Sequence, residues 1–408
     1  MKFHWLIILF LGSVVSLQAQ PRSSFAIRTI TAGITLQRAD DTTTLWDAIH
    51  FLQKAREQYQ SAGYVVQTVR ITTQHLYLLR QGEPEGDFIE KLMALDRIAQ
   101  KQNIVLGMGW LLPANTYDAT ATKMATDIIE QTQTISFTLP ISKRGAGIYP
   151  KSIRSSAEII RAIAKTSEGG EGNFRFAALA NCPGGIPFFP AGFHQGEHSF
   201  AIGMETPNII REVFSHCTWE DATAELTKAM ESKLQPVETI ALAISRQYGW
   251  PYDGIDTSPA PGLDASIGEA IEALTHEPFG SASTLSACSM ITTTIKQLDV
   301  RRIGYCGLML PVIEDPVLAQ RASENRYTVQ DLLLFSAVSG TGLDVIPLPG
   351  ETTADELERL LQDVAALSLK YENKALSARL FLIPGKVAGE KVTFANPWLT
   401  GVRIMPIR

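Results

Sequence analysis

Cysteine is scarce in this chain, which has only four cysteines among its 408 residues. No two of them form a Cys-x-x-Cys pair, because they stand far apart at Cys182, Cys217, Cys288 and Cys306. This spacing excludes a zinc-finger or disulfide-rich scaffold, both of which need closely spaced cysteines. One or two disulfides in an oxidising compartment and buried free thiols are the two alternatives that it leaves open.

Positive charge is also in short supply. Lys and Arg number 36 against 42 Asp and Glu, so the formal net charge is -6, and removal of Lys2 with the first 19 residues would make it -7. No basic run follows those first residues. Because nucleic acid and anionic membranes both carry negative charge, they are poor partners for such a mildly acidic surface.

The apolar run at residues 5–15 is too short for a membrane-spanning helix, which needs about 20 residues. Lys2 precedes this run, and Ser16-Leu17-Gln18-Ala19 follows it as a cleavage region, an order that is typical of a secretory signal peptide. We therefore predict that residues 1–19 are a signal peptide and that the mature chain begins near Gln20. The protein would then be exported to the periplasm or the extracellular space, without a membrane partner after cleavage. An uncleaved membrane anchor is the alternative.

Strand-like and helix-like segments alternate along the chain, and it contains no sequence repeat of 20–50 residues. The predicted strands are residues 26–36, 65–73, 104–112, 134–141, 174–182, 199–204, 343–348, 380–383 and 402–407. The predicted helices are residues 44–62, 88–102, 122–132, 220–248, 284–298, 327–338 and 353–369, with further helix starts at Pro207 and near Ser266. This order indicates an α/β protein with a largely parallel sheet covered by helices.

Residues 186–205, with the sequence IPFFPAGFHQGEHSFAIGME, hold a dense group of reactive side chains. Pro187 and Pro190 stiffen the backbone, and the glycines allow it to approach a ligand closely. His194 and Glu197 follow, just before a predicted strand. Because loops on a rigid scaffold are frequent carriers of function, we predict that His194 and Glu197 are catalytic. A polar turn without function is the alternative.

We expect residues 252–261 to form a rigid polar loop between two helices, because prolines and a glycine restrict its backbone. A restricted backbone keeps side chains in place, and we predict Asp256 as the third catalytic residue. The alternative is a helix-capping loop, with Asp264 as the N-cap of the helix near Ser266. The predicted substrate-binding residues in and next to these two stretches are His198, Ser199, Glu205, Asp253, Ser258, Asp264 and Ser266.

Seven stretches of the sequence carry a pattern that extends over nearly the whole mature chain. They are residues 28–34 (RTITAGI), 189–194 (FPAGFH), 199–205 (SFAIGME), 254–261 (GIDTSPAP), 266–268 (SIG), 310–315 (LPVIED) and 342–346 (GLDVI). Together they resemble family 711 of the domains of unknown function. The resemblance implies the ten-stranded α/β barrel found in pyruvate formate-lyase and anaerobic ribonucleotide reductase. It also implies an extra N-terminal α+β part at residues 20–115, before a barrel at residues 116–408, with both parts in one compact body. It implies no established reaction.

The implied barrel invites comparison with glycyl radical enzymes, whose motif is Arg-Val-x-Gly followed by an aromatic residue. The nearest match is residues 337–341, with the sequence AVSGT, which lacks both the arginine and the aromatic residue. No two cysteines adjoin, and an exported protein would have to shelter an oxygen-sensitive radical after leaving its activating enzyme. We therefore expect no glycyl radical. The signal peptide is a departure from the usual pattern of the family.

Three functions fit the predicted site. The first is a non-radical hydrolase or lyase acting on a small polar or saccharide substrate, with Glu197 and Asp256 as acid and base and His194 as proton carrier or orienting donor. The second is a divalent-metal-dependent hydrolase, because His194, Glu197 and His198 have the His-x-x-Glu-His spacing of inverted zinc peptidases, although that motif works on a helix. The third is a binding protein for a small molecule, without turnover. The substrate, the cofactor and the oligomeric state are left open.

Overall fold

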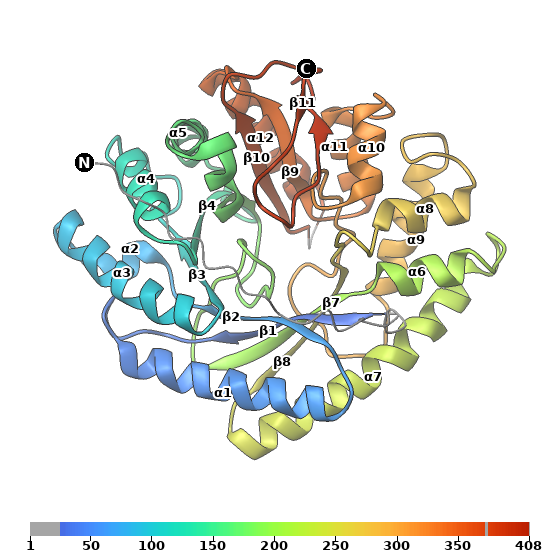
Figure 1. The fold of residues 1–408 in the computed structure, drawn as a ribbon, viewed down its shortest axis with the longest axis horizontal. Helices are drawn as coiled ribbons and strands as arrows, with labels where there is room; N and C mark the ends of the chain where they lie inside the picture. Colours follow the sequence, from blue (N-terminus) through green and yellow to red (C-terminus); the bar gives the residue numbers. More distant parts are fainter. Residues whose placement is uncertain (1–24, 372–373, 408) are drawn as a thin grey trace, which may run out of the picture.

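The structure, a computed structural model, describes residues 25–371 and 374–407. In these residues a central sheet of ten strands is combined with 13 helices, one of them a 3-10 helix. Figure 1 shows the helices around the outside and the strands toward the middle of the molecule. This arrangement confirms the predicted α/β class.

The elements alternate along the chain in the expected order. The strands of the sheet are β1 (Ala26–Gly33), β2 (Val66–Thr72), β3 (Ile104–Trp110), β4 (Ile135–Lys143), β5 (Gly147–Ile148), β6 (Phe176–Ala180), β7 (Ser199–Glu205), β8 (Tyr252–Pro259), β9 (Gly342–Pro349) and β10 (Leu376–Ile383). A separate hairpin joins β11 (Lys391–Val392) to β12 (Val402–Arg403). The helices are α1 (Thr42–Ser61), α2 (Leu76–Arg80), α3 (Glu85–Lys101), α4 (Ala121–Gln131), α5 (Pro150–Thr166), η1 (Glu168–Arg175), α6 (Pro207–Phe214), α7 (Ala222–Tyr248), α8 (Ile267–Thr275), α9 (Thr284–Ile295), α10 (Pro316–Ser323), α11 (Val329–Val338) and α12 (Ala354–Lys370).

The sheet is largely parallel, as predicted. Its order is β8-β7-β1-β2-β3-β4-β6-β10-β9, with β5 paired to β4. The five strands from β1 to β6 in this order are parallel to one another. The pairs β7-β8 and β9-β10 are each internally parallel, but they join β1 and β6 in antiparallel fashion.

The two edge strands, β8 and β9, both contact the segment 302–311. Ile255 on β8 forms an isolated parallel bridge with Arg302, and Pro311 forms another with Asp344 on β9. These single bridges do not show the closed barrel that the resemblance implies, and the likeness to glycyl radical enzymes is likewise not shown. The ten-stranded sheet itself is confirmed.

The helices bury one face of the sheet, which we call its outer face. Helix α1 packs on β1 and β2, α3 on β3, α7 on β8 and α11 on β9. The main hydrophobic core of the molecule includes Val69 and Ile71 of β2, which point to this outer face. Because side chains alternate between the faces of a strand, Thr68 and Arg70 point to the opposite, inner face.

Residues 252–261 correct a prediction, because they are not a loop between helices. Residues 252–259 form β8, which pairs in parallel with β7. The suggested N-cap is also wrong: Ser266, and not Asp264, caps α8 by accepting a hydrogen bond from Glu269 N at 2.9 Å. The helices α5 and α10 were not predicted.

Several other predictions concern the chain as a whole. All four cysteines are free, and no helix within the described residues is long and apolar enough to cross a membrane. The predicted signal peptide and its cleavage near Gln20 lie outside the described residues. Strands from both sides of the predicted boundary at residues 115 and 116 share the sheet, while the boundary itself stays a prediction.

Candidate functional site

The inner face of the sheet is covered by the loop that contains residues 186–198. Thr31 on β1 donates a hydrogen bond to the Pro187 carbonyl at 2.8 Å, and His194 N donates to the Thr73 carbonyl at 2.8 Å. At Gly107 on β3 a Cβ atom would lie 2.8 Å from the Gly192 carbonyl oxygen, so the close approach of loop and strand requires glycine there. The loop therefore lies inside the molecule, directly against β1, β2 and β3.

A second apolar cluster, separate from the main core, forms where this loop meets the inner face. Its members include Ile186, Phe188, Ala191 and Phe193 of the loop, together with Tyr305 and Met309 of the segment 302–311. Ala260 is also a member, so side chains from both stretches singled out in the sequence meet here, but they do so through apolar residues.

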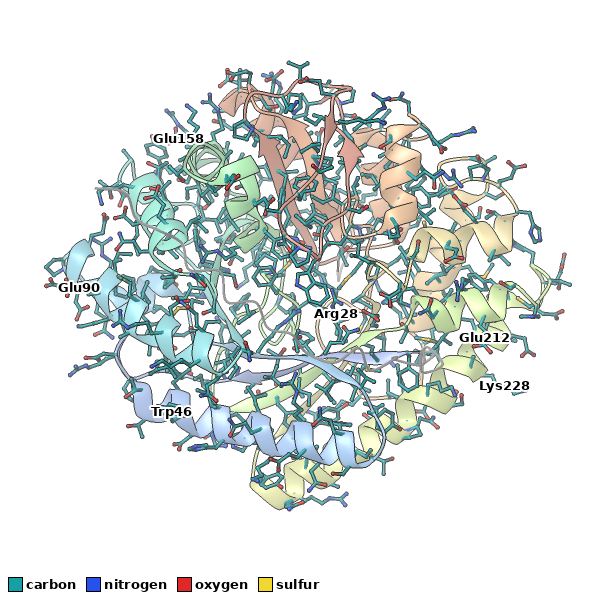
Figure 2. All side chains as sticks on the ribbon, viewed as in Figure 1. Arg28, Trp46, Glu90, Glu158, Glu212 and Lys228 are labelled. Carbon is teal, nitrogen blue, oxygen red and sulfur yellow. The ribbon has the colours of Figure 1, made fainter. Side chains whose placement is uncertain are left out.

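Beside this cluster lies a cavity of about 190 Å³, which we call the inner cavity. Its apolar wall includes Phe188, Phe189, Pro190, Met309, Pro311 and Trp398. Its polar wall includes Arg28, Arg70, Tyr305, Glu314, Asp344 and Arg379. Figure 2 labels Arg28 near the centre of the view, where the strands and the loops come together. The cavity thus combines apolar surface with several charged groups, as small-molecule sites commonly do.

Two of the three arginines in the cavity wall have carboxylate partners. Arg379 Nε lies 2.5 Å from Asp344 Oδ1, and its Nη2 lies 2.5 Å from Glu314 Oε2. Burial by itself would lower the pKa of Arg379, but the two carboxylates raise it above its usual value. The second oxygen of each carboxylate bonds to no residue that the structure describes, although both residues line the cavity.

Arg28 has a partner at the rim of the cavity. Its Nη1 atom donates to Glu205 Oε2 at 2.9 Å and to Gln67 Oε1 at 3.0 Å. Burial raises the pKa of Glu205 above its ordinary value, and the charge of Arg28 offsets part of this effect. Glu205 was predicted as a substrate-binding residue; the structure places it next to the inner cavity, through Arg28.

Arg70 differs from Arg28 and Arg379. Within residues 25–371 and 374–407 its guanidinium forms no hydrogen bond and no ion pair, and its Nε atom is buried without a partner. The centroid of the Phe189 ring lies 5.9 Å from Arg70 Cζ. The charge of Glu314 also acts favourably on Arg70, although those of Arg28 and Arg379 oppose it. Burial lowers the pKa of Arg70 to about 9, so the side chain is still a cation at neutral pH.

The predicted residues His194, Glu197, His198, Ser199 and Asp253 line a different and more open hollow of about 480 Å³, which we call the outer hollow. Ser199 Oγ donates to Asp253 Oδ2 at 2.5 Å. The Nε2 atom of His194 lies 2.7 Å from the carbonyl oxygen of Glu197, so it donates there and holds the loop. Burial lowers the pKa of His194, and the hydrogen bond to Glu197 opposes the shift.

Asp256 does not lie in the outer hollow. It is fully buried, and its two oxygens accept hydrogen bonds from Ser258 N, Ser258 Oγ, Tyr305 N and Cys306 N at 2.6–3.1 Å. The structure therefore brings His194 and Glu197 together but separates them from Asp256 and Ser258. The catalytic role of these residues stays a prediction.

The remaining predicted residues lie apart from both sites. Asp264 is exposed, and its backbone carbonyl accepts a hydrogen bond from Asn208 Nδ2 at 3.2 Å. Ser266 Oγ donates to Asp315 Oδ1 at 2.7 Å. Asp315 also accepts hydrogen bonds from backbone N–H groups at the starts of α8 and α10, and so it joins these two helices. These contacts indicate a structural role for Ser266.

The predicted metal alternative gains no geometric support. No group of three or more His, Cys, Asp or Glu side chains within the described part of the chain is arranged to hold a metal ion. The segment that contains His194, Glu197 and His198 is not helical, so the two histidines do not share the helix face that the zinc-peptidase motif needs.

Several residues of the inner cavity were not singled out from the sequence. Arg28, Glu314 and Asp344 belong to stretches that carry the family resemblance, so charged residues within those stretches were an available signal. Arg70 and Arg379 belong to none of them. No pattern in the sequence distinguishes these two from arginines on a solvent-facing strand.

Comparison with known proteins gives a family and no reaction. The family model described as "Uncharacterised ACR (DUF711)" matches residues 21–395. A UPF0210 protein of Bifidobacterium adolescentis is 25% identical over 401 residues, covering 91% of this chain and 88% of the relative. One from Carboxydothermus hydrogenoformans is 26% identical over 399 residues with the same coverage, and one from Pyrobaculum aerophilum is 26% identical over 378 residues, covering 86% and 83%.

Proposed function

This chain belongs to the DUF711 family of uncharacterised proteins, and since that membership names no reaction, we propose its function from the inner cavity. There, we propose, it binds a small organic molecule and transforms it by acid–base chemistry, as a non-radical hydrolase or lyase. One observation carries the proposal: a cavity inside the molecule joins an apolar wall to several charged side chains.

The size and lining of the cavity define the ligand. A volume of about 190 Å³ is below the roughly 300–1,000 Å³ of sites for drug-sized ligands, so the ligand is small. Phe188, Met309 and Pro311 offer apolar surface, which suits a ligand with an apolar body better than a saccharide.

Glu314 and Asp344 support the chemical part of the proposal. One oxygen of each carboxylate accepts a hydrogen bond from Arg379. The other oxygen has no partner among the described residues, and both residues line the cavity. A carboxylate oxygen in this position can accept a proton from a bound substrate, which is the step that a general base supplies. Tyr305, in the same wall, adds a hydroxyl group.

The outer hollow is the second candidate site. Ser199 and Asp253 share a hydrogen bond there, with His194 and Glu197 in the same lining. This arrangement supports the acid–base alternative predicted from the sequence. Because His194 Nε2 is held by the Glu197 carbonyl, proton transfer through that atom would require the loop to open.

Two matched variants separate the candidates. Ala260 lines the inner cavity and Gln195 lines the outer hollow. Ala260→Leu therefore fills the first, and Gln195→Leu changes the second without altering the lining of the first. A thermal-shift screen of small acids, esters, amides and sugars would provide ligands for wild-type protein. We expect their binding to weaken in Ala260→Leu and to persist in Gln195→Leu. The reverse result would move the function to the outer hollow.

Two further parts of the proposal concern shape and location. We propose that the segment 302–311, bridged to β8 and β9, completes the wall of a barrel around the inner cavity. We also propose that residues 1–19 direct export, and mass spectrometry of the protein from its native cells would then give an N-terminus near Gln20. Recovery of Met1 in the mature pool would contradict export by cleavage.

A further inference from the structure

Arg70 lies in the middle of the sheet, where a charged side chain has little access to water. Its register partners are Thr31 on β1 and Val105 on β3, so neighbouring strands flank it on both sides. Its side chain points to the inner face and lines the inner cavity. The residue as a whole is half-buried, and its Nε atom is buried without a partner.

The other two arginines of the cavity provide an internal comparison. Arg379 is matched by Glu314 and Asp344, and Arg28 is matched by Glu205. Each of these three carboxylates thus forms its ion pair with an arginine other than Arg70. Of the three guanidinium groups, only that of Arg70 has no acceptor at all among the described residues.

The protein compensates only in part for the burial of this charge, because the attraction of Glu314 is opposed by the charges of Arg28 and Arg379. The ring of Phe189 lies 5.9 Å from Arg70 Cζ, near the outer limit of a cation–π contact. Such a contact offsets only part of the free energy needed to take a guanidinium out of water. When a buried charge has no partner in the protein, a bound ligand of opposite charge can supply one.

We propose that Arg70 binds the acid group of the ligand, so that the substrates of the inner cavity are small organic acids with one carboxylate or phosphate group and an apolar body. This inference rests on the proposed function and narrows it. The planar guanidinium of Arg70 can offer two parallel N–H donors to such a group, which is the geometry that carboxylates and phosphates favour. One acid group is expected, because the other two arginines already have carboxylate partners.

The apolar body of the ligand follows from the surroundings of Arg70. Phe188 and Phe189 lie on the loop side of the cavity, and Met309 and Pro311 lie on the segment 302–311. A molecule with an acid at one end and a flat apolar group at the other would place each part against a matching surface. Benzoate and phenyl phosphate are the simplest probes with this shape, and benzamide is their neutral counterpart.

The test is calorimetric titration of the whole protein with these three probes. We expect wild-type protein to bind benzoate, phenyl phosphate or both, and to bind benzamide more weakly. Arg70→Met should weaken binding of the acid by on the order of tenfold or more, because a charge-assisted bidentate contact is lost. Arg70→Lys should retain part of the affinity, since it keeps the charge without the fork. The comparison between benzoate and phenyl phosphate identifies the acid.

A second measurement separates a ligand anchor from a structural residue. Without ligand, Arg70→Met should unfold at an equal or higher temperature than wild-type protein, because an apolar side chain of similar length replaces an uncompensated charge. Arg56→Met is the matched control, since Arg56 is half-buried outside the cavity and donates hydrogen bonds to the Val66 and Gln67 carbonyls. Arg56→Met should lower the unfolding temperature and leave probe binding unchanged.

The outcomes distinguish this inference from the proposed function. One outcome is that a neutral ligand binds and that its binding is weakened by Ala260→Leu but not by Arg70→Met. In that case the acid group is wrong, while the proposed function stands. If both variants leave the binding of every probe and screened ligand unchanged, both proposals are wrong. A marked fall in the unfolding temperature of ligand-free Arg70→Met would also overturn the inference, because Arg70 would then be structural.

Discussion

Asp256 is fully buried and Arg70 is half-buried, and the surroundings of these two ionisable side chains are opposite. Asp256 accepts four hydrogen bonds, three of them from backbone N–H groups, and so it ties β8 to the segment 302–311. Arg70 has no hydrogen-bond partner among the described residues and faces a cavity. Proteins satisfy nearly all of their buried polar groups. The satisfied charge therefore holds the fold, and the unsatisfied one indicates where a ligand belongs.

The largest expected effect on stability comes from removing an arginine that has carboxylate partners. Arg379→Met leaves Glu314 and Asp344 as buried carboxylates without a counter-charge. We expect a loss of about 3–5 kcal/mol in the free energy of unfolding, the usual result of removing one partner of a buried ion pair. Urea denaturation at neutral pH would measure it. A loss below that of Arg56→Met, expected at about 1 kcal/mol, would show that the carboxylates do not depend on Arg379.

Asp256→Asn should have the next largest effect. The amide keeps the shape of the carboxylate, but its NH₂ group must face either Tyr305 N–H or the donors that bond to Oδ1. We expect a loss of roughly 2–3 kcal/mol, because buried donors are left without an acceptor. Urea denaturation again provides the measurement. An unchanged midpoint, together with a large loss of turnover on an identified substrate, would instead support the catalytic role predicted for Asp256.

His75 should give the smallest effect at neutral pH, and one that grows as the pH falls. It is buried against Trp110, with Nε2 unpartnered, and burial lowers its pKa to about 4. The unfolded chain takes up a proton near its ordinary pKa of about 6.5, so the unfolded state binds more protons between these values. Stability should therefore fall by roughly 2–3 kcal/mol as the pH drops from about 6.5 to 4.

The control for this effect is His75→Gln, which removes the titrating group. Comparison of wild-type protein and His75→Gln by urea denaturation at several pH values would isolate the contribution of His75. An equal pH slope in the two proteins would assign the acid sensitivity to other groups.

Much of the fold could be predicted from the sequence, because most elements have regular apolar patterns. The helix that begins at Pro207 and the strands around residues 26–36 and 65–73 were predicted near their observed bounds. Strand β8 was not, since Asp253, Gly254 and Pro259 are unfavourable in strands. Its pairing with β7 and the contacts of Asp256 outweigh this local preference.

The candidate site was predicted only in part, for a related reason. The sequence directed attention to the right loop at residues 186–198, but to its polar residues His194 and Glu197, which line the outer hollow. The apolar residues of the same loop line the inner cavity. An arginine on a strand, such as Arg70, looks like a solvent-facing residue until the loop that covers it is placed.

A crystal structure of wild-type protein with benzoate would test the central claim most directly. The account predicts the carboxylate oxygens within hydrogen-bond distance of the Arg70 guanidinium and the ring against Phe188 and Met309. Benzoate bound only in the outer hollow beside His194, or an inner cavity in which Arg70 is paired with a carboxylate of the protein itself, would contradict it.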